Sequence, residues 1–546
     1  MTATAHVDTF VADHLPRPEL WPEFRFDRPE LRFATQLNCA TELLDRWVQS
    51  GEGERPCVQG STVRWSYTEL MQEANRVARV LVEDLKLVPG NRVLLRGGNS
   101  PMLAACWLAV MKAGGIAVTT MPLLRAKELA EIVSKARVSH ALCDAGLGTE
   151  LAAASARCPT LTHVCHFGSG KGSDELAARA ATKPATFDNV LTSATDASII
   201  AFTSGTTGKP KATVHFHRDV MAACACWPRH LLRASGSDVF IGSPPLAFTF
   251  GLGGLLLFPL SIGASTVLVE KATPEALIDE IEKRRPTVCV TAPTSYRAMA
   301  ARLANRDVSS LRKCVSAGEP LSAATRKAWR DATGIDIIDG IGTTELLHIF
   351  LSHGDDDVRP GATGKPVPGY TVAVLDDRLR ALPPGQPGQL AVKGPTGCRY
   401  LDDDRQRDYV QGGWNLTGDT YVVDDDGWFH FQARSDDMII SSGYNIAGPE
   451  VEAALLLHDG VAECGVIGAP DENRGQIVKA FVVLRPGFNA GPAMAEELQR
   501  FVKDTIAPYK YPRAIEFRDA LPRTDTGKLQ RFRLRAESRT AAGMEP

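Results

Sequence analysis

The chain has 546 residues, 44% hydrophobic and 23% charged, so it can bury a large core spread over more than one folding unit. Its formal net charge of -3 provides no basic excess for wrapping a nucleic acid or adhering to an anionic membrane. The twelve cysteines show no CxxC pair, zinc-site spacing or disulfide framework, and the first residues lack the basic start and apolar run of a signal peptide. We therefore expect a cytoplasmic protein with no nucleic-acid or membrane partner.

Strand and helix patterns alternate through the first part of the chain. The β-branched runs at 91–97, 264–270 and 287–293 precede helical patterns at 100–115, 273–286 and 294–305. This alternation predicts parallel sheets covered by helices. The uncharged stretch 239–269 is long enough to span a bilayer, but Pro244, Pro245 and Pro259 interrupt it. We interpret it as a buried strand–loop–helix–strand passage.

After about Pro360 the alternation of strand and helix patterns gives way to short strand patterns separated by turns. Glycine and proline turns separate short strands at 369–394, which indicates a β-rich subdomain. Helical patterns at 450–459 and 493–506 then flank strand patterns at 462–470 and 479–487. The predicted fold is α/β: a large N-terminal domain of α/β sheets with a β-rich subdomain, residues 1–435, and a small C-terminal α+β domain, residues 436–546.

A candidate phosphate loop follows the apolar run at 197–202. Its residues are Thr203, Ser204, Gly205, Thr206, Thr207, Gly208, Lys209, Pro210 and Lys211. Glycines and small hydroxylic residues leave backbone N–H groups and hydroxyls free to face phosphate oxygens, and a lysine adds positive charge. The spacing is not that of a P-loop NTPase. Taken alone, such a cluster could also be a flexible surface turn.

Further motifs follow in a fixed order along the chain. They are Asp339-Gly340-Ile341-Gly342-Thr343-Thr344-Glu345, Leu416-Thr417-Gly418-Asp419, Arg434-Ser435-Asp436-Asp437, Ser442-Gly443-Tyr444 and Pro522-Arg523-Thr524-Asp525-Thr526-Gly527-Lys528. With the phosphate loop, this series resembles the adenylate-forming superfamily of acyl-CoA synthetases, luciferases and peptide-synthetase adenylation domains. The resemblance spans nearly the whole chain and implies an acid–CoA ligase that uses ATP, Mg²⁺ and coenzyme A.

The resemblance also implies roles for individual residues. The residues expected to bind ATP or AMP are Thr203, Ser204, Gly205, Thr206, Thr207, Gly208, Gly318, Glu319, Pro320, Asp339, Gly340, Ile341, Gly342, Thr343, Asp419 and Arg434. The residues expected to take part in catalysis are Lys528, Glu345, Thr344 and Lys209. The Glu345 carboxylate would supply a hard oxygen ligand for Mg²⁺. Asp419 suits the ribose hydroxyls because a carboxylate has two acceptor oxygens. Without the resemblance, the Thr-Thr-Glu triplet would indicate a helix N-cap with a solvated acid, and Thr-Gly-Asp an Asx turn.

The same resemblance implies that one active site catalyses both adenylation of the acid and transfer of the acyl group to coenzyme A. Lys528 would bridge the acid and the α-phosphate during adenylation, after which the mobile C-terminal domain rotates about Asp436. Ser442, Gly443 and Tyr444 would then line a tunnel for the pantetheine arm of coenzyme A.

Four residues are expected to line the acid pocket: Phe248, Phe250, Ala317 and His348, the last on a helix after Glu345. Two phenylalanines suit a flat aromatic acid better than a long alkyl chain. The segments around Glu345 and at the C-terminus resemble benzoate–CoA ligases, and the segment 434–458 resembles 2-aminobenzoate–CoA ligase. His348 could accept a hydrogen bond from an ortho amino group, or be a packed core histidine.

Other functions remain open on the sequence. An adenylating enzyme could load the acid onto a carrier-protein pantetheine, although no carrier domain follows Lys528, or the chain could be a medium-chain acyl-CoA synthetase. A luciferase-like oxidation has no supporting feature beyond the shared scaffold. A catalytically dead nucleotide-binding regulator would not need Glu345, Asp419 and Lys528 together. A homodimer is compatible with the sequence but not indicated by it.

Overall fold

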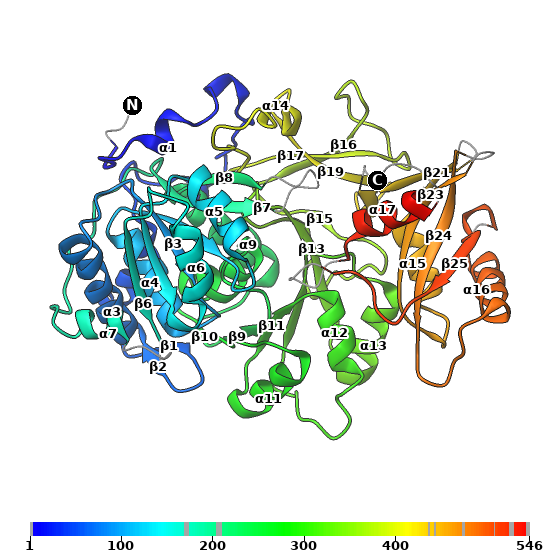
Figure 1. Ribbon diagram of the computed structural model, residues 1–546, viewed down its shortest axis with the longest axis horizontal. Coiled ribbons are helices and arrows are strands. Elements are labelled where there is room, and N and C mark those ends of the chain that lie inside the picture. The colour runs from blue at the N-terminus through cyan, green and yellow to red at the C-terminus, as the bar shows by residue number, and fades with distance from the viewer. Residues whose placement is uncertain are drawn as a thin grey trace.

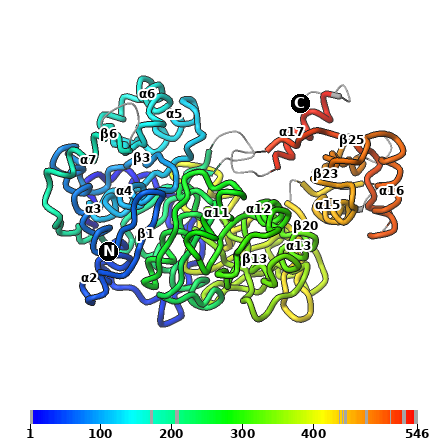
Figure 2. Tube along the Cα trace, turned by 90° about the horizontal axis from the view of Figure 1, so that it is seen from below, coloured from blue at the N-terminus to red at the C-terminus, as the bar shows by residue number. Residues whose placement is uncertain are grey.

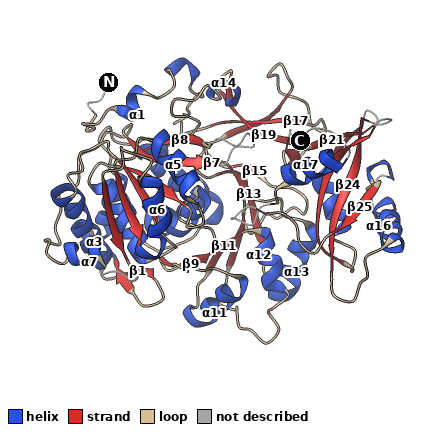
Figure 3. Ribbon diagram, viewed as in Figure 1, coloured by secondary structure: helices blue, strands red, loops and turns tan. Residues whose placement is uncertain are grey.

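The computed structural model describes residues 4–168, 174–203, 210–434, 437–441, 444–471, 475–506, 508–523 and 529–541. Within them the chain forms four β-sheets that carry helices (Figures 1 and 3). This confirms the α/β fold class, including the β-rich subdomain and the C-terminal α+β unit.

The first sheet has six strands in the order β6-β5-β3-β4-β7-β8. Its strands are β3 Arg92–Arg96, β4 Ile116–Thr120, β5 His140–Asp144, β6 His163–Phe167, β7 Ala197–Thr203 and β8 Lys211–Phe216. The accompanying helices are α3 Tyr67–Arg79, α4 Pro101–Lys112, α5 Ala126–Lys135, α6 Gly148–Ser155 and α7 Glu175–Ala180. Helix α4 is apolar on every side and almost wholly buried, as its sequence requires.

The second sheet has nine strands in the order β15-β14-β13-β12-β11-β9-β10-β1-β2. They are β1 Pro56–Gln59, β2 Arg64–Ser66, β9 Val239–Gly242, β10 Ser265–Val267, β11 Val288–Thr291, β12 Lys313–Ser316, β13 Ile337–Gly342, β14 Ile349–Ser352 and β15 Lys365–Pro366. Its neighbours in the chain include α8 His217–Ala225, α9 Thr249–Leu252, α10 Phe258–Ser261, α11 Pro274–Arg284, α12 Pro293–Ala300 and α13 Ala323–Thr333. The stretch 239–269 is the predicted strand–loop–helix–strand passage. None of the described helices is long and apolar enough to cross a membrane.

The remaining two sheets have five strands each. One contains β16 Thr371–Leu375, β17 Gly388–Lys393, β18 Val410–Gln411, β19 Trp414–Val423 and β20 Phe429–Arg434, with α14 Gln406–Tyr409 beside it. The other contains β21 Met438–Ser441, β22 Tyr444–Ala447, β23 Val461–Asp471, β24 Gly475–Leu484 and β25 Ala514–Phe517, with α15 Gly448–Leu455, α16 Pro492–Thr505 and α17 Arg531–Ala541. Figures 1 and 2 place this C-terminal sheet at the opposite end of the molecule from β3–β6.

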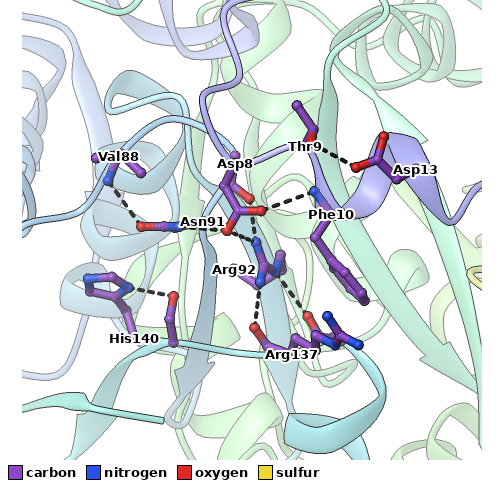
Figure 4. Close-up of polar contacts among 12 residues, drawn as sticks. Asp8, Thr9, Phe10, Asp13, Val88, Asn91, Arg92, Arg137 and His140 are labelled. Atoms are coloured by element: carbon purple, nitrogen blue, oxygen red, sulfur yellow. Dashed lines mark hydrogen bonds and ion pairs between the residues drawn. The ribbon is translucent and has the colours of Figure 1, made fainter. Parts of the chain in front are cut away.

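The segment before the first sheet is tied to the start of β3. Asp8 accepts hydrogen bonds from Asn91 Nδ2 at 2.9 Å and from the Arg92 guanidinium (Figure 4). Gly90 has φ +92°, and a Cβ there would lie 2.2 Å from the Asp8 carbonyl oxygen. Only glycine lets the N-terminal segment approach this closely.

Candidate active site

Glu345 lies in a tight turn between β13 and β14, so the prediction of a helix after it is wrong. The apolar run after Glu345 forms strand β14, which is fully buried. Strand β14 pairs antiparallel with β13, and Leu351 lies opposite Ile341. Leu347 adopts φ +68°, a left-handed conformation that reverses the chain. A short apolar run fits a buried strand as well as a helix, and pairing with β13 decides between them.

The Glu345 carboxylate is buried, which contradicts the alternative of a solvated acid. The residue is 7% exposed, and its Oε1 accepts a hydrogen bond from Tyr400 Oη at 2.5 Å. Lys211 Nζ donates in turn to Tyr400 Oη at 3.3 Å and lies 5.1 Å from the centre of that ring. Burial, with the neighbouring Glu345, raises the pKa of Tyr400, so its hydroxyl keeps its proton.

Three further contacts hold the Glu345 turn, two through backbone carbonyls and one through a side chain. His215 Nε2 donates to the Thr344 carbonyl at 2.7 Å, and burial lowers the pKa of this histidine to about 4. Thr396 Oγ1 donates to the Leu346 carbonyl at 2.8 Å, and the Thr343 and Tyr409 hydroxyls lie 3.2 Å apart. Because these contacts come from separate parts of the chain, the turn is fixed from several sides.

Asp419 and Arg434 lie opposite each other on paired strands. Their Cα atoms are partners in the β19–β20 ladder, and Arg434 Nη1 donates to Asp419 Oδ1 at 3.2 Å. The Asp419 side chain is buried at 6% exposure, whereas that of Arg434 is 45% exposed. The Thr-Gly-Asp triplet is therefore within strand β19, and the alternative of an isolated Asx turn does not describe it.

Asp339 is the third of the six residues of β13 and lies beside the loop of Gly318, Glu319 and Pro320. Its neighbour in the sheet is Ser316, the last residue of β12, and that loop begins two residues later. Asp339 is 8% exposed, and burial raises its pKa to about 7. Gly340, Ile341 and Gly342 complete the strand.

His348 and Phe250, two of the four expected acid-pocket residues, are in contact. His348 Nε2 lies 3.4 Å from the Phe250 carbonyl oxygen, and the ring centroids are 5.8 Å apart. The His348 ring also packs edge-on against Phe258 at 4.4 Å and lies 5.8 Å from Trp227. Burial lowers the pKa of His348 to about 3, so the imidazole is neutral.

The other two acid-pocket residues lie on elements that border this cluster. Phe248 is the half-buried residue that precedes α9, and Phe250 lies within that helix. Ala317 follows β12 and is 4% exposed.

Several predicted site residues lie outside the described residues. They are Ser204, Gly205, Thr206, Thr207, Gly208, Lys209, Asp436, Ser442, Gly443 and Lys528. The strands flanking the phosphate loop are described, and Thr203 and Lys211 pair across the β7–β8 ladder. Tyr444 begins β22, where its backbone pairs with Ser441.

No pattern in the sequence singles out Tyr400, Tyr409 or His215. Tyr400 and Glu345 are 55 positions apart, and His215 and Thr344 are 129 apart, so no local spacing links them. Lys211 is the last residue of the phosphate-loop motif, but the sequence does not indicate that it contacts Tyr400.

The chain belongs to the family of AMP-binding enzymes. Residues 44–399 match the family model described as AMP-binding enzyme, and residues 450–528 match the AMP-binding enzyme C-terminal domain. The first match therefore covers the sheet whose strands β13 and β14 flank Glu345, and the second covers β23, β24 and β25 of the C-terminal sheet. This confirms the resemblance to adenylate-forming acyl-CoA ligases.

Individual relatives are similar over almost their full length. A benzoate–CoA ligase of Thauera aromatica is 36% identical, over 96% of this chain and 99% of that protein. The crystal structure of the anthranilate CoA ligase AuaEII in complex with anthranoyl-AMP superposes with a TM-score of 0.90 at 33% identity, covering 95% of this chain and 100% of that one. The mouse mitochondrial acyl-coenzyme A synthetase ACSM3 is 32% identical, over 94% and 92% of the two chains.

Proposed function

We propose that the protein is an aryl-CoA ligase with 2-aminobenzoate as its favoured acid and benzoate as the next. An oxygen of the acid's carboxylate attacks the α-phosphorus of ATP, and pyrophosphate leaves. The thiol of coenzyme A then attacks the acyl carbon of the adenylate, and AMP leaves. The acyl-adenylate is a mixed carboxylic–phosphoric anhydride, so AMP is a good leaving group and the second step becomes feasible.

The buried Nδ1 atom of His348, which has no hydrogen-bond partner among the described residues, is the observation that carries the choice of acid. A neutral imidazole has one N–H, and the Phe250 carbonyl can only accept, so the proton belongs on Nε2. Nδ1 is then a lone-pair acceptor, and it is buried without a partner among the described residues. An ortho amino group donates N–H and would satisfy this nitrogen, whereas the unsubstituted ring of benzoate would not.

The surroundings of His348 fit an aromatic ring. Phe250, Phe258 and Trp227 pack around the imidazole, so a flat acid beside it would meet aromatic faces and edges. The aryl-CoA ligases among the similar proteins support the same choice, since a benzoate ligase and an anthranilate ligase both match over nearly their full length.

Glu345 suits the proposed Mg²⁺ because its carboxylate supplies a hard oxygen. Oε1 is held by Tyr400, while Oε2 has no hydrogen-bond partner among the described residues. Protein-bound Mg²⁺ uses one or two carboxylates together with substrate phosphates, and it would offset the phosphates' charge there. We assign Asp419 and Arg434 to the ribose, and Asp339 with Gly318, Glu319 and Pro320 to the edge of the adenine.

The remaining roles rest on the likeness to the family. We assign Lys528 to the adenylation step, Lys209 to the departing pyrophosphate, Asp436 to a hinge between residues 1–435 and 436–546, and Ser442 to Tyr444 to the pantetheine tunnel. On this assignment the acid, ATP and coenzyme A are the enzyme's small-molecule partners.

The test is pyrophosphate release across benzoic, 2-aminobenzoic, hydroxybenzoic, phenylacetic and octanoic acids, with and without coenzyme A. We expect 2-aminobenzoate to give the highest kcat/KM and octanoate the lowest. The similarity to ACSM3 makes an aliphatic acid the main competing substrate. Faster turnover of octanoate than of every aryl acid would refute the aryl assignment.

A further inference from the structure

Tyr400 occupies a position that the reaction itself does not explain. Its side chain is fully buried, and its hydroxyl lies between the carboxylate of Glu345 and the ammonium of Lys211. These two charged groups come from the β13–β14 turn and from the start of β8, at the end of the phosphate loop. Tyr400 therefore connects the two segments to which ATP phosphates are assigned.

The backbone of Tyr400 is held firmly in place. Residues 399–401 run antiparallel to β8, with Val214 N donating to the Arg399 carbonyl at 2.8 Å and Leu401 N to the Ala212 carbonyl at 2.9 Å. Tyr400 N donates to Gln406 Oε1, also at 2.9 Å. A tyrosine whose backbone is held by an isolated β-bridge to Thr213 of β8 presents its hydroxyl at one defined point.

The direction of the hydrogen bonds follows from chemistry. A lysine ammonium has donors only, so the Tyr400 oxygen accepts from Lys211. The Tyr400 proton is then directed at Glu345 Oε1, at 2.5 Å, a distance typical of an O–H donor to a carboxylate. Oε1 is thereby engaged, and Oε2 is the oxygen left for another ligand.

We infer that Tyr400 is the positioning residue for Glu345, fixing the carboxylate so that Oε2 is aimed at the Mg²⁺ of the bound nucleotide, and that Lys211 holds the Tyr400 hydroxyl in its donor orientation. The inference rests on the proposed function, because it takes Glu345 as the metal ligand. It assigns to Tyr400 no contact with acid, ATP or coenzyme A.

The test is ATP binding measured by calorimetry, without any acid, over a titration of MgCl₂ and in EDTA. Tyr400→Phe removes the hydroxyl and keeps the ring. We expect the magnesium concentration for half-maximal ATP binding to rise by about 10- to 100-fold, the usual loss when a group that orients a metal ligand is removed. ATP binding in EDTA should not change.

Tyr67→Phe is the matched control. Tyr67 is also fully buried, and its hydroxyl donates to the Ala264 carbonyl at 2.7 Å, remote from Glu345 in the sequence. This variant loses a buried hydroxyl with the same kind of structural cost but should keep the wild-type magnesium dependence. An equal shift in both variants would reduce Tyr400 to a structural role and overturn the inference.

A double-mutant cycle with Glu345→Gln gives an independent readout. If Tyr400 acts only through the carboxylate, Tyr400→Phe should change magnesium dependence in wild-type protein and add nothing in the Glu345→Gln background. Additive effects would overturn the inference. Failure of the wild-type protein to bind ATP at all would instead refute the proposed function, so the two failures are distinguishable.

Discussion

Replacing His348 by alanine tests how the site would tell 2-aminobenzoate from benzoate. The change removes two things: an aromatic neighbour of Phe258 and Phe250, and the lone-pair acceptor Nδ1. Loss of packing should affect both acids alike. Loss of the acceptor should affect only the acid that carries an N–H donor, by about 1–3 kcal/mol, the cost of a buried polar group left unpaired.

That difference corresponds to a fall in kcat/KM that is about 5- to 150-fold larger for 2-aminobenzoate than for benzoate. The assay is pyrophosphate release at saturating ATP with each acid varied. His348→Asn is the matched variant, because its amide oxygen can lie near the position of Nδ1 and should recover part of the preference. Equal losses on both acids, or an Asn variant no more selective than the Ala variant, would remove His348 from acid recognition.

Three further predictions concern charge inside the protein and in the C-terminal domain. Burial raises the pKa of Asp339 to about 7, against about 4 in the unfolded chain, so between these values the folded state holds a proton that the unfolded state has lost. The unfolding free energy of the wild type relative to Asp339→Asn should therefore fall by up to about 4 kcal/mol as pH rises from about 4 to about 7. Denaturant titrations of the two proteins that show no pH-dependent difference would contradict this. Arg399→Met should cost about 3–5 kcal/mol of unfolding free energy because it removes the guanidinium 2.7 Å from the fully buried Asp219, whose next cation, Arg218, lies 3.9 Å away. The pair of the exposed Arg330 and the half-buried Asp336, 3.3 Å apart, supplies the control, since Arg330→Met should cost no more than about 1 kcal/mol; similar losses in the two variants would refute the argument. Lys528→Ala should nearly abolish adenylate formation while leaving thioester formation from supplied acyl-adenylate largely intact, and equal damage to both half-reactions would refute the role assigned to this lysine.

Local patterns predicted most of the secondary structure. The strand pattern at 91–97 is β3, the helical pattern at 100–115 contains α4, and the uncharged stretch 239–269 is a buried passage of the second sheet. These elements follow from side-chain periodicity and from proline positions, which are local properties. The order of the motifs identified the family, and the structure places Asp419 beside Arg434 as neighbours in a ladder.

Features that depend on distant segments were not predictable in this way. The run after Glu345 fits a helix when considered alone, and it becomes β14 because β13 lies beside it. Tyr400 reaches Glu345 because residues 399–401 add to β8. His348 could be assigned a tautomer only after the Phe250 carbonyl was found next to Nε2.

The most direct test of the central claim is to identify the products by mass spectrometry. With 2-aminobenzoate, ATP and Mg²⁺ alone, we predict 2-aminobenzoyl-AMP and pyrophosphate; with coenzyme A added, we predict 2-aminobenzoyl-CoA and AMP. Octanoate under the same conditions should give little of either product. Efficient octanoyl-CoA formation without 2-aminobenzoyl-CoA, or cleavage of ATP to ADP and phosphate, would contradict the assignment of this chain as an AMP-forming aryl-CoA ligase.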